Sequence, residues 1–455
     1  MMGTTFVVLA FAFVAAANAS APQPEQVHLA LAGADDAGDS TGMRIAWFTP
    51  GNATVPSIAQ YGVSASALDK TARGTSHQYM PGRGYHHVAL ADCSGLPAGY
   101  VYYRVGDGAD AWSPVFRFRH GITAADTVKV SIFGDMGYED STQRPMAIAV
   151  DGLVDTWSAT YTRRTLEGLK NAGDIDMVWH VGDIGYMDDA YAHDPLSFHY
   201  EDVYNGYMNW LQNLTSIMPY HVSPGNHESE CHSPACVLHL DDYGLKLNNF
   251  TAFNHRWHMP SAESGAHPGS NMWYSWNYGP VHWVSVDTET DWPGAEERTT
   301  GDSHMKDLPA GGFGADGEYL AWVEADLKRA DAARKAGTGR PWLIAGGHRP
   351  FPRDELQPLF DKYGVDAYFA GHGHSYSRQR TDDGITWIMV GGAGCDEMAQ
   401  GDNATASWPQ GDGGGGVVTS GRYASGVLVA NATALRWRLI DSATGGVLDE
   451  LTITK

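Results

Sequence analysis

The stretch Val178-Trp179-His180-Val181-Gly182-Asp183-Ile184-Gly185-Tyr186 decides how the rest of the chain is interpreted. Residues 177–181 form an apolar run that predicts a buried strand, and the Gly-Asp step predicts where the chain leaves the sheet. Side chains at the carboxyl ends of such strands point into the crevice where α/β proteins place their chemistry. Gly182 lets the backbone pass close to whatever Asp183 binds. We therefore interpret Asp183 as a ligand shared by two metal ions.

The same pattern, an apolar strand followed by glycine and then by Asp, Asn or His, occurs at four other places. These strands are predicted at residues 128–133, 218–224, 342–345 and 367–370. The turns after them read Gly134-Asp135-Met136-Gly137, Gly225-Asn226-His227-Glu228, Gly346-Gly347-His348-Arg349-Pro350 and Gly371-His372-Gly373-His374. An accidental turn has no need of a metal-binding residue type. The repetition therefore predicts a metal site of oxygen and imidazole ligands.

Length and charge narrow the class of protein. A chain of 455 residues is too long for one core and predicts two or three domains. The 53 acidic residues outnumber the 30 basic ones, which gives a formal net charge of -23. Such a surface repels nucleic acid and acidic membranes. We therefore expect neither of them as a partner.

Residues 1–19 are predicted to be a secretory signal peptide, although its amino-terminal end carries no Lys or Arg. Residues 6–17 are apolar but too few to span a bilayer, and Ala17-Asn18-Ala19 fits a cleavage pattern. The mature chain would then be secreted, or delivered along the same pathway to a vacuole or lysosome. Glycan acceptor sequences support this, at Asn52, Asn213, Asn249, Asn403 and Asn431.

Four cysteines suit an oxidising compartment, and they allow three pairings. We predict a disulfide between Cys231 and Cys236, because Pro234 bends the short loop that joins them. The alternative is that all four cysteines are unpaired buried thiols. The pairing of Cys93 and Cys395 is left open.

The hydrophobic periodicity changes along the chain, and these changes predict the domain boundaries. Residues 20–120 show short alternating strands with frequent turns, which predicts a β-sandwich. Residues 126–395 carry the strand-to-Asp, strand-to-Asn and strand-to-His units, with helices predicted at 161–171 and 318–335. Residues 396–455 are expected to complete this second domain with carboxy-terminal strands.

The five motifs in this order resemble those of the purple acid phosphatases, which belong to the binuclear metallophosphoesterases. The residues at 24–29 and 102–106 also resemble that family's amino-terminal domain, and those at 390–394 resemble its carboxy-terminal segment. Nearly all of the mature chain is covered. The resemblance implies an all-β fibronectin-like sandwich followed by an α/β metallophosphoesterase domain, in which a mixed β-sheet sandwich is flanked by helices.

The resemblance also implies the metal ligands. A ferric ion would be held by Asp135, Asp183, Tyr186 and His374. A divalent ion, Zn²⁺, Mn²⁺ or Fe²⁺, would be held by Asp183, Asn226, His348 and His372. Tyr186 discriminates among metals, because a deprotonated phenol is a good ligand for ferric iron and a poor one for zinc. The implied activity is that of a secreted acid phosphatase, acting on small phosphorylated substrates as a monomer or homodimer, by attack of a metal-bound hydroxide on a phosphate monoester.

The resemblance specifies the substrate-binding residues less completely than the metal ligands. His227 is implied to contact the phosphate or to protonate the leaving oxygen, and Asn226 is expected to lie beside the substrate. Many plant members place further histidines after the position of His348, and this chain has none before His372. Either Arg353 binds the phosphate instead, or another loop supplies the acid.

Two rival functions stay open at this point. The first is a phosphodiesterase or nucleotide pyrophosphatase on the same scaffold, which would differ in the loops at 188–200 and 297–314. The second is a non-catalytic secreted binding protein with a vestigial metal site. The complete ligand set argues against the second.

Overall fold

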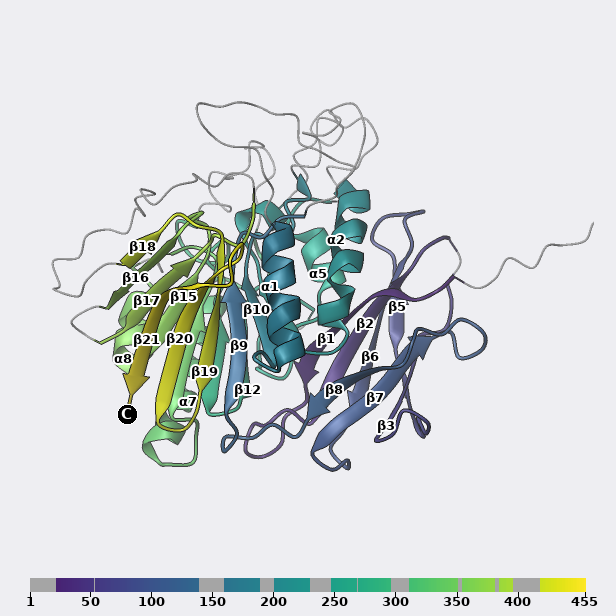
Figure 1. The fold of residues 1–455 in the computed structure, drawn as a ribbon, viewed down its shortest axis with the longest axis horizontal. Coiled ribbons are helices and arrows are strands. Elements are labelled where there is room, and N and C mark those ends of the chain that lie inside the picture. Colours follow the sequence, from purple (N-terminus) through teal and green to yellow (C-terminus); the bar gives the residue numbers. More distant parts are fainter. Residues whose placement is uncertain are drawn as a thin grey trace, which may run out of the picture.

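The computed structural model describes residues 22–52, 54–138, 159–188, 200–229, 247–267, 269–295, 311–350, 354–380, 384–395 and 418–455. Within them, an amino-terminal β-sandwich packs beside a larger domain built of two facing sheets with helices on their outer sides (Figure 1). The predicted fold class is thereby confirmed. Among the described residues, no helix has the length and apolar character that crossing a membrane requires.

The sandwich consists of two four-stranded sheets. The first has the order β1-β2-β6-β5 and the second β4-β3-β7-β8. Their bounds are β1 Glu25–Ala32, β2 Gly42–Thr49, β3 Ile58–Gly62, β4 Lys70–Arg73, β5 Thr75–His77, β6 Tyr85–Asp92, β7 Gly99–Gly106 and β8 Phe116–His120. In β7 the buried side chains of Val101, Tyr103 and Val105 alternate with more exposed ones, as one buried face requires.

The first sheet of the larger domain has six strands in the order β11-β10-β9-β19-β20-β21. Their bounds are β9 Val128–Phe133, β10 Met177–Val181, β11 Tyr220–Ser223, β19 Ala424–Ala430, β20 Ala434–Asp441 and β21 Val447–Thr454. Strand β10 runs parallel to both β9 and β11, so these three strands end at the same edge of the sheet. Each is a run of almost wholly buried residues, as expected of a parallel strand covered on both faces.

The second sheet has seven strands in the order β12-β13-β14-β15-β17-β16-β18. Their bounds are β12 Tyr274–Tyr278, β13 Val281–Ser285, β14 Trp342–Gly346, β15 Ala367–Ala370, β16 Tyr376–Arg380, β17 Thr386–Val390 and β18 Val418–Ser420. Strands β13, β14, β15 and β17 are parallel to their neighbours in that series, so the residues after β14 and β15 also meet at one edge.

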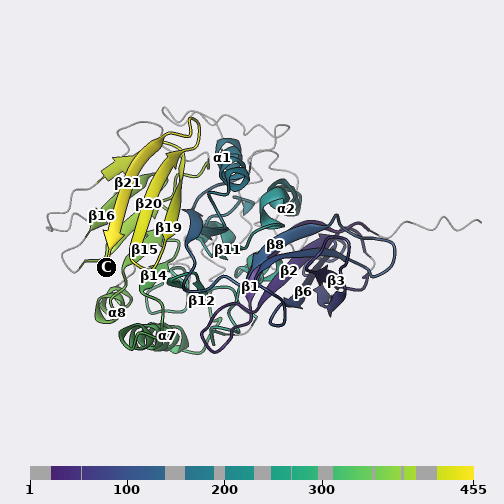
Figure 2. The same ribbon diagram turned by 60° about the horizontal axis from the view of Figure 1, so that its bottom comes forward.

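Aromatic side chains fill the space between the two sheets. The ring of Trp179 on β10 lies 5.3 Å from that of Trp276 on β12 and 5.8 Å from that of Trp283 on β13, both edge to face. The outer faces are covered by α1 Ala159–Ala172 and α2 Tyr200–Thr215 on one side, and by α7 Glu318–Lys335 and α8 Gln357–Tyr363 on the other (Figure 2). A short helix, α5, spans Thr251–Arg256.

The sandwich is tied to the larger domain by buried polar contacts. The backbone N–H of Leu31 on β1 donates to Nε2 of His221 on β11 over 3.1 Å. The hydroxyl of Tyr103 on β7 donates to the carbonyl of Ser216 over 2.6 Å. Because His221 is fully buried and acts as the acceptor, this interface requires its imidazole to be uncharged.

Candidate metal centre

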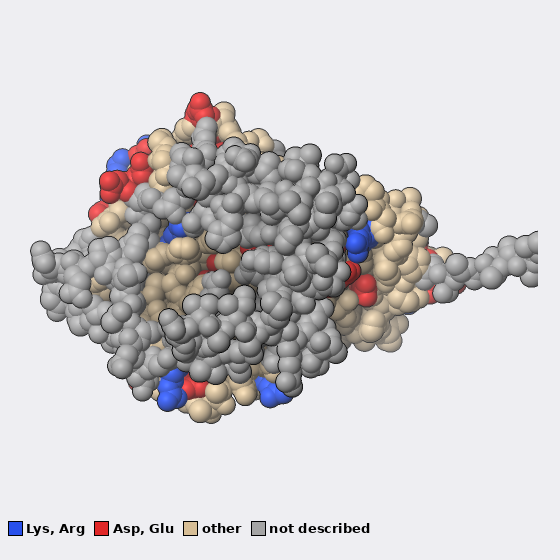
Figure 3. Space-filling view, turned by 90° about the horizontal axis from the view of Figure 1, so that it is seen from above, with Lys and Arg blue, Asp and Glu red and all other residues tan. Residues whose placement is uncertain are grey.

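The five motifs converge at the carboxyl ends of the parallel strands of both sheets, at the top of Figure 1. Asp135 follows β9, Asp183 follows β10, and Asn226 begins a short 3₁₀ turn after β11, Asn226–Glu228. The first sheet therefore supplies oxygen donors. The second supplies imidazoles, from His348 after β14 and from the turn after β15. Viewed from above, a hollow lies near the centre of this face, and described residues, acidic ones among them, are visible in it (Figure 3).

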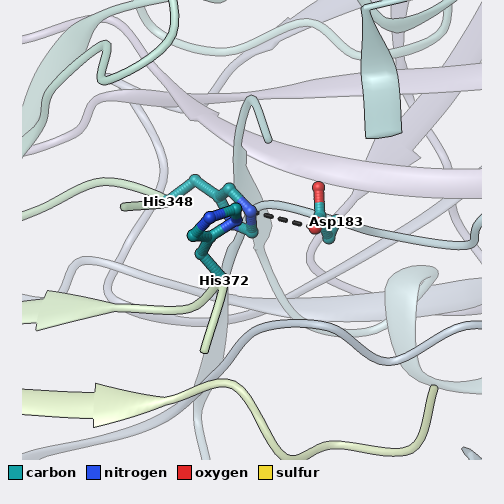
Figure 4. Close-up of side chains that lie close together, drawn as sticks. All are labelled: Asp183, His348 and His372. Carbon is teal, nitrogen blue, oxygen red and sulfur yellow. Dashed lines mark ion pairs between the residues drawn. The ribbon is translucent and has the colours of Figure 1, made fainter. Parts of the chain in front are cut away.

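One group of donors surrounds the position between Asp183 and His348. Oδ2 of Asp183 lies 2.9 Å from Nε2 of His348, and Oδ1 of Asn226 lies 3.1 Å from the same nitrogen. Oδ1 of Asn226 is also 3.0 Å from Nδ1 of His372. The side chains of Asp183, His348 and His372 point toward one another (Figure 4). Nδ1 of His348 lies 3.0 Å from the carbonyl of Val181, which holds the ring's hydrogen there and leaves Nε2 as a lone-pair donor.

A second group lies on the other side of Asp183. The phenol oxygen of Tyr186 is 3.3 Å from Oδ1 of Asp135, 3.4 Å from Oδ2 of Asp183 and 3.0 Å from Nε2 of His374. Nε2 of His374 is in turn 3.2 Å from Oδ1 of Asp135. Both groups place three metal-ligating atoms within 4.8 Å of one another, and Asp183 belongs to both. The donor set, two carboxylates, a phenol, an amide oxygen and three imidazoles, fits two hard or intermediate cations.

The backbone of the motif turns adopts strained conformations at four of the proposed ligands. Eight non-glycine residues of the described chain have left-handed φ angles, and four of the eight lie at this site: Asp135 (60°), Asp183 (50°), Tyr186 (53°) and His372 (64°). Such conformations cost free energy and cluster at functional sites. All four belong to the motifs picked out from the sequence.

The motif glycines leave room for the ligands. A Cβ atom at Gly225 would lie 2.3 Å from Oδ1 of Asp183, and one at Gly371 would lie 2.5 Å from Oδ2 of Asp135. A Cβ atom at Gly182, whose φ is 84°, would lie 2.6 Å from Nδ1 of His348. The glycines are therefore required by the close approach of the ligands as well as by the turns.

Burial and mutual contact shift the pKa values of these groups. Burial alone would lower the pKa of His348, but the Asp183 carboxylate beside it raises that pKa to about 9. Burial would raise the pKa of Asp183, but His348 and His227 hold it well below its usual range. Burial, together with His348 and the guanidinium of Arg349, lowers the pKa of His372 to about 2. Protons thus balance the charges of this cluster, and a bound cation would displace them.

Two acidic residues that the motif analysis did not select support the site. Asp188 is fully buried, and its Oδ2 lies 2.8 Å from Nδ1 of His227. Glu228 accepts the backbone N–H groups of Asp183 and Ile184 over 2.9 and 2.8 Å, which fixes the turn after β10. The sequence places both residues next to the motifs: Asp188 stands two residues after Tyr186, and Glu228 completes the Gly-Asn-His-Glu motif. A lone acidic residue does not reveal its partner before the fold is known.

The seven predicted ligands and His227 are therefore brought together. Arg353, Cys231, Cys236 and Asn403 lie outside the described residues, so the predicted phosphate contact, disulfide and one glycan site stay predictions. Cys93 and Cys395 are both buried free thiols.

The four glycan acceptors within the described residues differ in solvent exposure. Asn52 and Asn213 are exposed, whereas Asn249 and Asn431 are half-buried. Oδ1 of Asn249 also accepts the N–H of Gly311 over 2.8 Å.

Comparison with protein families covers most of the chain. Residues 24–120 match the purple acid phosphatase N-terminal domain, residues 128–376 match the calcineurin-like phosphoesterases, and residues 384–450 match an iron/zinc purple acid phosphatase-like carboxy-terminal domain. The chain belongs to the calcineurin-like phosphoesterases, and within them to the purple acid phosphatases. Members of this family are metal-dependent phosphoester hydrolases, and so is this protein.

Several named relatives resemble this purple acid phosphatase along most of its length. Acid phosphatase A of Cryphonectria parasitica is 28% identical over 95% of this chain and 92% of its own. Human acid phosphatase type 7 is 28% identical over 84% of this chain and 80% of its own. Purple acid phosphatase 21 of Arabidopsis thaliana is 28% identical over 78% of this chain and 66% of its own.

Proposed function

We propose that this protein is a secreted acid phosphatase that hydrolyses phosphate monoesters at a site for one ferric and one divalent ion. The observation that carries the proposal is the position of Asp183, whose carboxylate lies within both groups of ligating atoms. A single carboxylate shared in this way is suited to holding two cations a few ångströms apart, about 3.5–4 Å in two-metal sites. The relatives are named as acid phosphatases, which supports the substrate class.

The ferric ion would be held by Asp135, Asp183, Tyr186 and His374, and the divalent ion, Zn²⁺, Mn²⁺ or Fe²⁺, by Asp183, Asn226, His348 and His372. When bound, the two cations would neutralise phosphate oxygens and lower the pKa of water. Tyr186 supports the ferric assignment, because its buried phenol lies within 3.4 Å of both carboxylates. Two carboxylates and one phenolate would offset three of the five positive charges, which leaves a net charge that attracts phosphate.

His227 is the residue that we propose to protonate the leaving oxygen. Its backbone N–H donates to Oδ1 of Asp183 over 3.0 Å, so His227 lies beside the carboxylate that both groups of ligating atoms share. Asp188 lies at Nδ1, so Nε2 is the ring nitrogen on the substrate side, 4.0 Å from Oδ2 of Asp183. The ring packs on Tyr186 at a centroid distance of 4.1 Å. A buried carboxylate at one nitrogen favours the charged imidazolium, which is the form that donates a proton.

Export and domain division complete the proposal. We propose that residues 1–19 are a signal peptide, that residues 20–120 form the sandwich domain, and that residues 126–395 form the catalytic domain, which residues 396–455 complete. The family matches at 24–120 and 128–376 support the first boundary, and the pairing of β19 with β9 supports a shared carboxy-terminal sheet.

Rates on a monoester and a diester test the function. We expect metal-loaded protein at acid pH to hydrolyse p-nitrophenyl phosphate at least about tenfold faster than bis(p-nitrophenyl) phosphate, and Asp183→Asn to abolish both activities. A faster reaction with the diester would favour a phosphodiesterase on the same scaffold. Metal-replete protein without activity on either ester would favour a binding protein.

A further inference from the structure

One sheet of the sandwich is basic, although the protein as a whole is strongly acidic. The four strands of the sheet β4-β3-β7-β8 contain one lysine and four arginines, and they contain no Asp or Glu. The whole chain has 53 acidic and 30 basic residues. Charges are screened over about 8 Å at physiological ionic strength, so the charge of this sheet, rather than the net charge, governs what binds to it. Such a sheet attracts anions.

The register of the strands places the four arginines on one face, in a diagonal row. Paired residues on neighbouring strands share a face, as do residues two apart along one strand. Four cross-strand pairs make up the row, and they are Tyr100–Arg119, Tyr102–Arg117, Gln60–Arg104 and Ile58–Arg73. Positions 100, 102 and 104 of β7 alternate with buried positions, so the row faces outward. By the strand spacing and the rise per residue, the row is about 25 Å long, with steps of about 7–12 Å.

Two of the arginines are held over aromatic rings. The guanidinium of Arg104 lies over the ring of Trp112, and that of Arg117 lies over the ring of Tyr100, each 4.2 Å from the ring centroid. Nε and Nη2 of Arg104 also donate to Oε1 of Gln60 over 2.9 and 2.7 Å. These partners fix the guanidinium groups without neutralising their charge.

Carboxylates approach the row only at its two ends. Within the described part of the chain, Arg119 is the one arginine of the row that pairs with carboxylates, those of Asp126 at 3.6 Å and Asp176 at 4.0 Å. At the other end, a hollow of about 300 Å³ lies beside Arg73, and Asp107 is part of its lining. Oδ1 of Asp107 accepts two backbone N–H groups of its own loop. The middle of the row therefore keeps its positive charge.

The shape of the row indicates the kind of anion. A compact anion reaches one or two of the arginines, whereas an extended chain with repeated negative charges reaches all four. Single-stranded nucleic acid fits less well, because its bases stack on open aromatic faces and one face of both Tyr100 and Trp112 is already covered. A planar carboxylate matches the guanidinium fork through two parallel hydrogen bonds. The arrangement therefore favours a polymer that carries carboxylates.

We propose that this arginine row, made of Arg73, Arg104, Arg117 and Arg119, binds a carboxylated polysaccharide of the polyuronate class. The polymer lies along the diagonal, with its carboxylates at the arginines and a sugar ring in the hollow beside Arg73. The sheet lies at the opposite end of the molecule from β16 and β18 (Figure 1). Binding there would retain the exported protein on an acidic matrix without covering the metal centre. The inference does not depend on the proposed phosphatase activity.

Calorimetric titration of the full-length protein with polygalacturonate tests the inference. We expect binding that weakens with added salt and is lost with the fully methyl-esterified polymer, which has the same backbone without the charges. Arg73→Gln/Arg117→Gln should bind about tenfold more weakly, since each exposed charge pair contributes up to about fivefold. Gln60→Glu, which puts a carboxylate into the row, should also weaken binding. Arg436→Gln is the matched control, because it removes an exposed strand arginine from the other domain, and it should bind as the wild type does.

The thermal midpoint and the rate on p-nitrophenyl phosphate are recorded for every variant and should stay those of the wild type. Unchanged affinity in Arg73→Gln/Arg117→Gln would overturn the inference, as would wild-type protein that does not bind polygalacturonate. If the double variant does not fold, unchanged affinity in the isosteric Gln60→Glu has the same meaning. Equal or tighter binding of polyglutamate or single-stranded DNA would assign the row to an acidic peptide or a nucleic acid and overturn the polysaccharide.

Discussion

Nδ1 of His227 lies 2.8 Å from Oδ2 of Asp188, a carboxylate with no exposed surface. Because a buried carboxylate orients the ring and favours its charged form, we predict that Asp188→Asn lowers kcat for an alkyl phosphate about 10- to 100-fold with both ions retained. Steady-state kinetics and metal analysis of the purified variant check this. An unchanged kcat would show that the pair has no part in catalysis.

The leaving group distinguishes proton donation from a general loss of structure. p-Nitrophenolate leaves without protonation, whereas an alkoxide needs a proton, so His227→Ala should lower kcat for an alkyl phosphate far more than for p-nitrophenyl phosphate. General acid catalysis contributes about 10²- to 10⁴-fold. Equal losses on both substrates would assign His227 to phosphate binding instead.

Gly225 is predicted to be indispensable for metal binding. An alanine Cβ there would lie 2.3 Å from Oδ1 of Asp183, in a contact that real Cβ atoms do not make. Gly225→Ala should therefore lose at least one of the two ions by elemental analysis. Gly168→Ala is the matched control, since that glycine lies within α1 with open space around its Cβ position. It should keep both ions and stabilise the protein by about 0.5–1 kcal/mol.

Tyr186 is predicted to colour the protein. Its phenol lies among Asp135, Asp183 and His374, where it would bind ferric iron as a phenolate. We expect a broad absorption band near the middle of the visible spectrum, lost in Tyr186→Phe and retained in Tyr100→Phe, which alters a half-exposed tyrosine of the sandwich. A colourless wild-type protein with two zinc ions would contradict the ferric assignment.

The interface between the domains is predicted to weaken in acid through His221. Burial, aided by Arg44, lowers the pKa of His221 to about 3, below the 6.5 of an unfolded histidine. Between these two pKa values the unfolded chain binds a proton that the folded chain excludes. The contribution of neutral His221 to the free energy of unfolding is therefore fully present above pH 6.5 and is lost as the pH falls toward 3. The loss reaches about 2 kcal/mol at pH 5 relative to pH 7.5.

Denaturant unfolding of wild type and His221→Gln at the two pH values measures that loss. Glutamine offers an acceptor to the Leu31 N–H without titrating, so the variant should show a smaller difference in unfolding free energy between pH 7.5 and 5. His267→Gln, at a half-exposed histidine, should behave as the wild type. Identical pH dependence in all three proteins would show that His221 does not cause the loss of stability in acid.

The sequence predicts the strands that lead into the site because each is a short apolar run ended by glycine. It predicts the ligand types for the same reason, since Asp183 and its counterparts stand directly after those strands. The sequence pattern does not indicate strands β4 and β5, because they are short, polar and partly exposed. The contacts of Asp188 with His227, and of Glu289 with Arg349, join residues 39 and 60 positions apart. No local pattern reveals such pairs, because the fold alone brings them together.

Anomalous diffraction from crystals of the metal-loaded protein, recorded at the iron edge and at the edge of the second metal, tests the shared-carboxylate centre most directly. The account predicts two peaks about 3.5–4 Å apart. Asp183 would lie between them, iron next to Tyr186, and the second metal next to His348. A single peak, or two peaks that do not share Asp183, would contradict it.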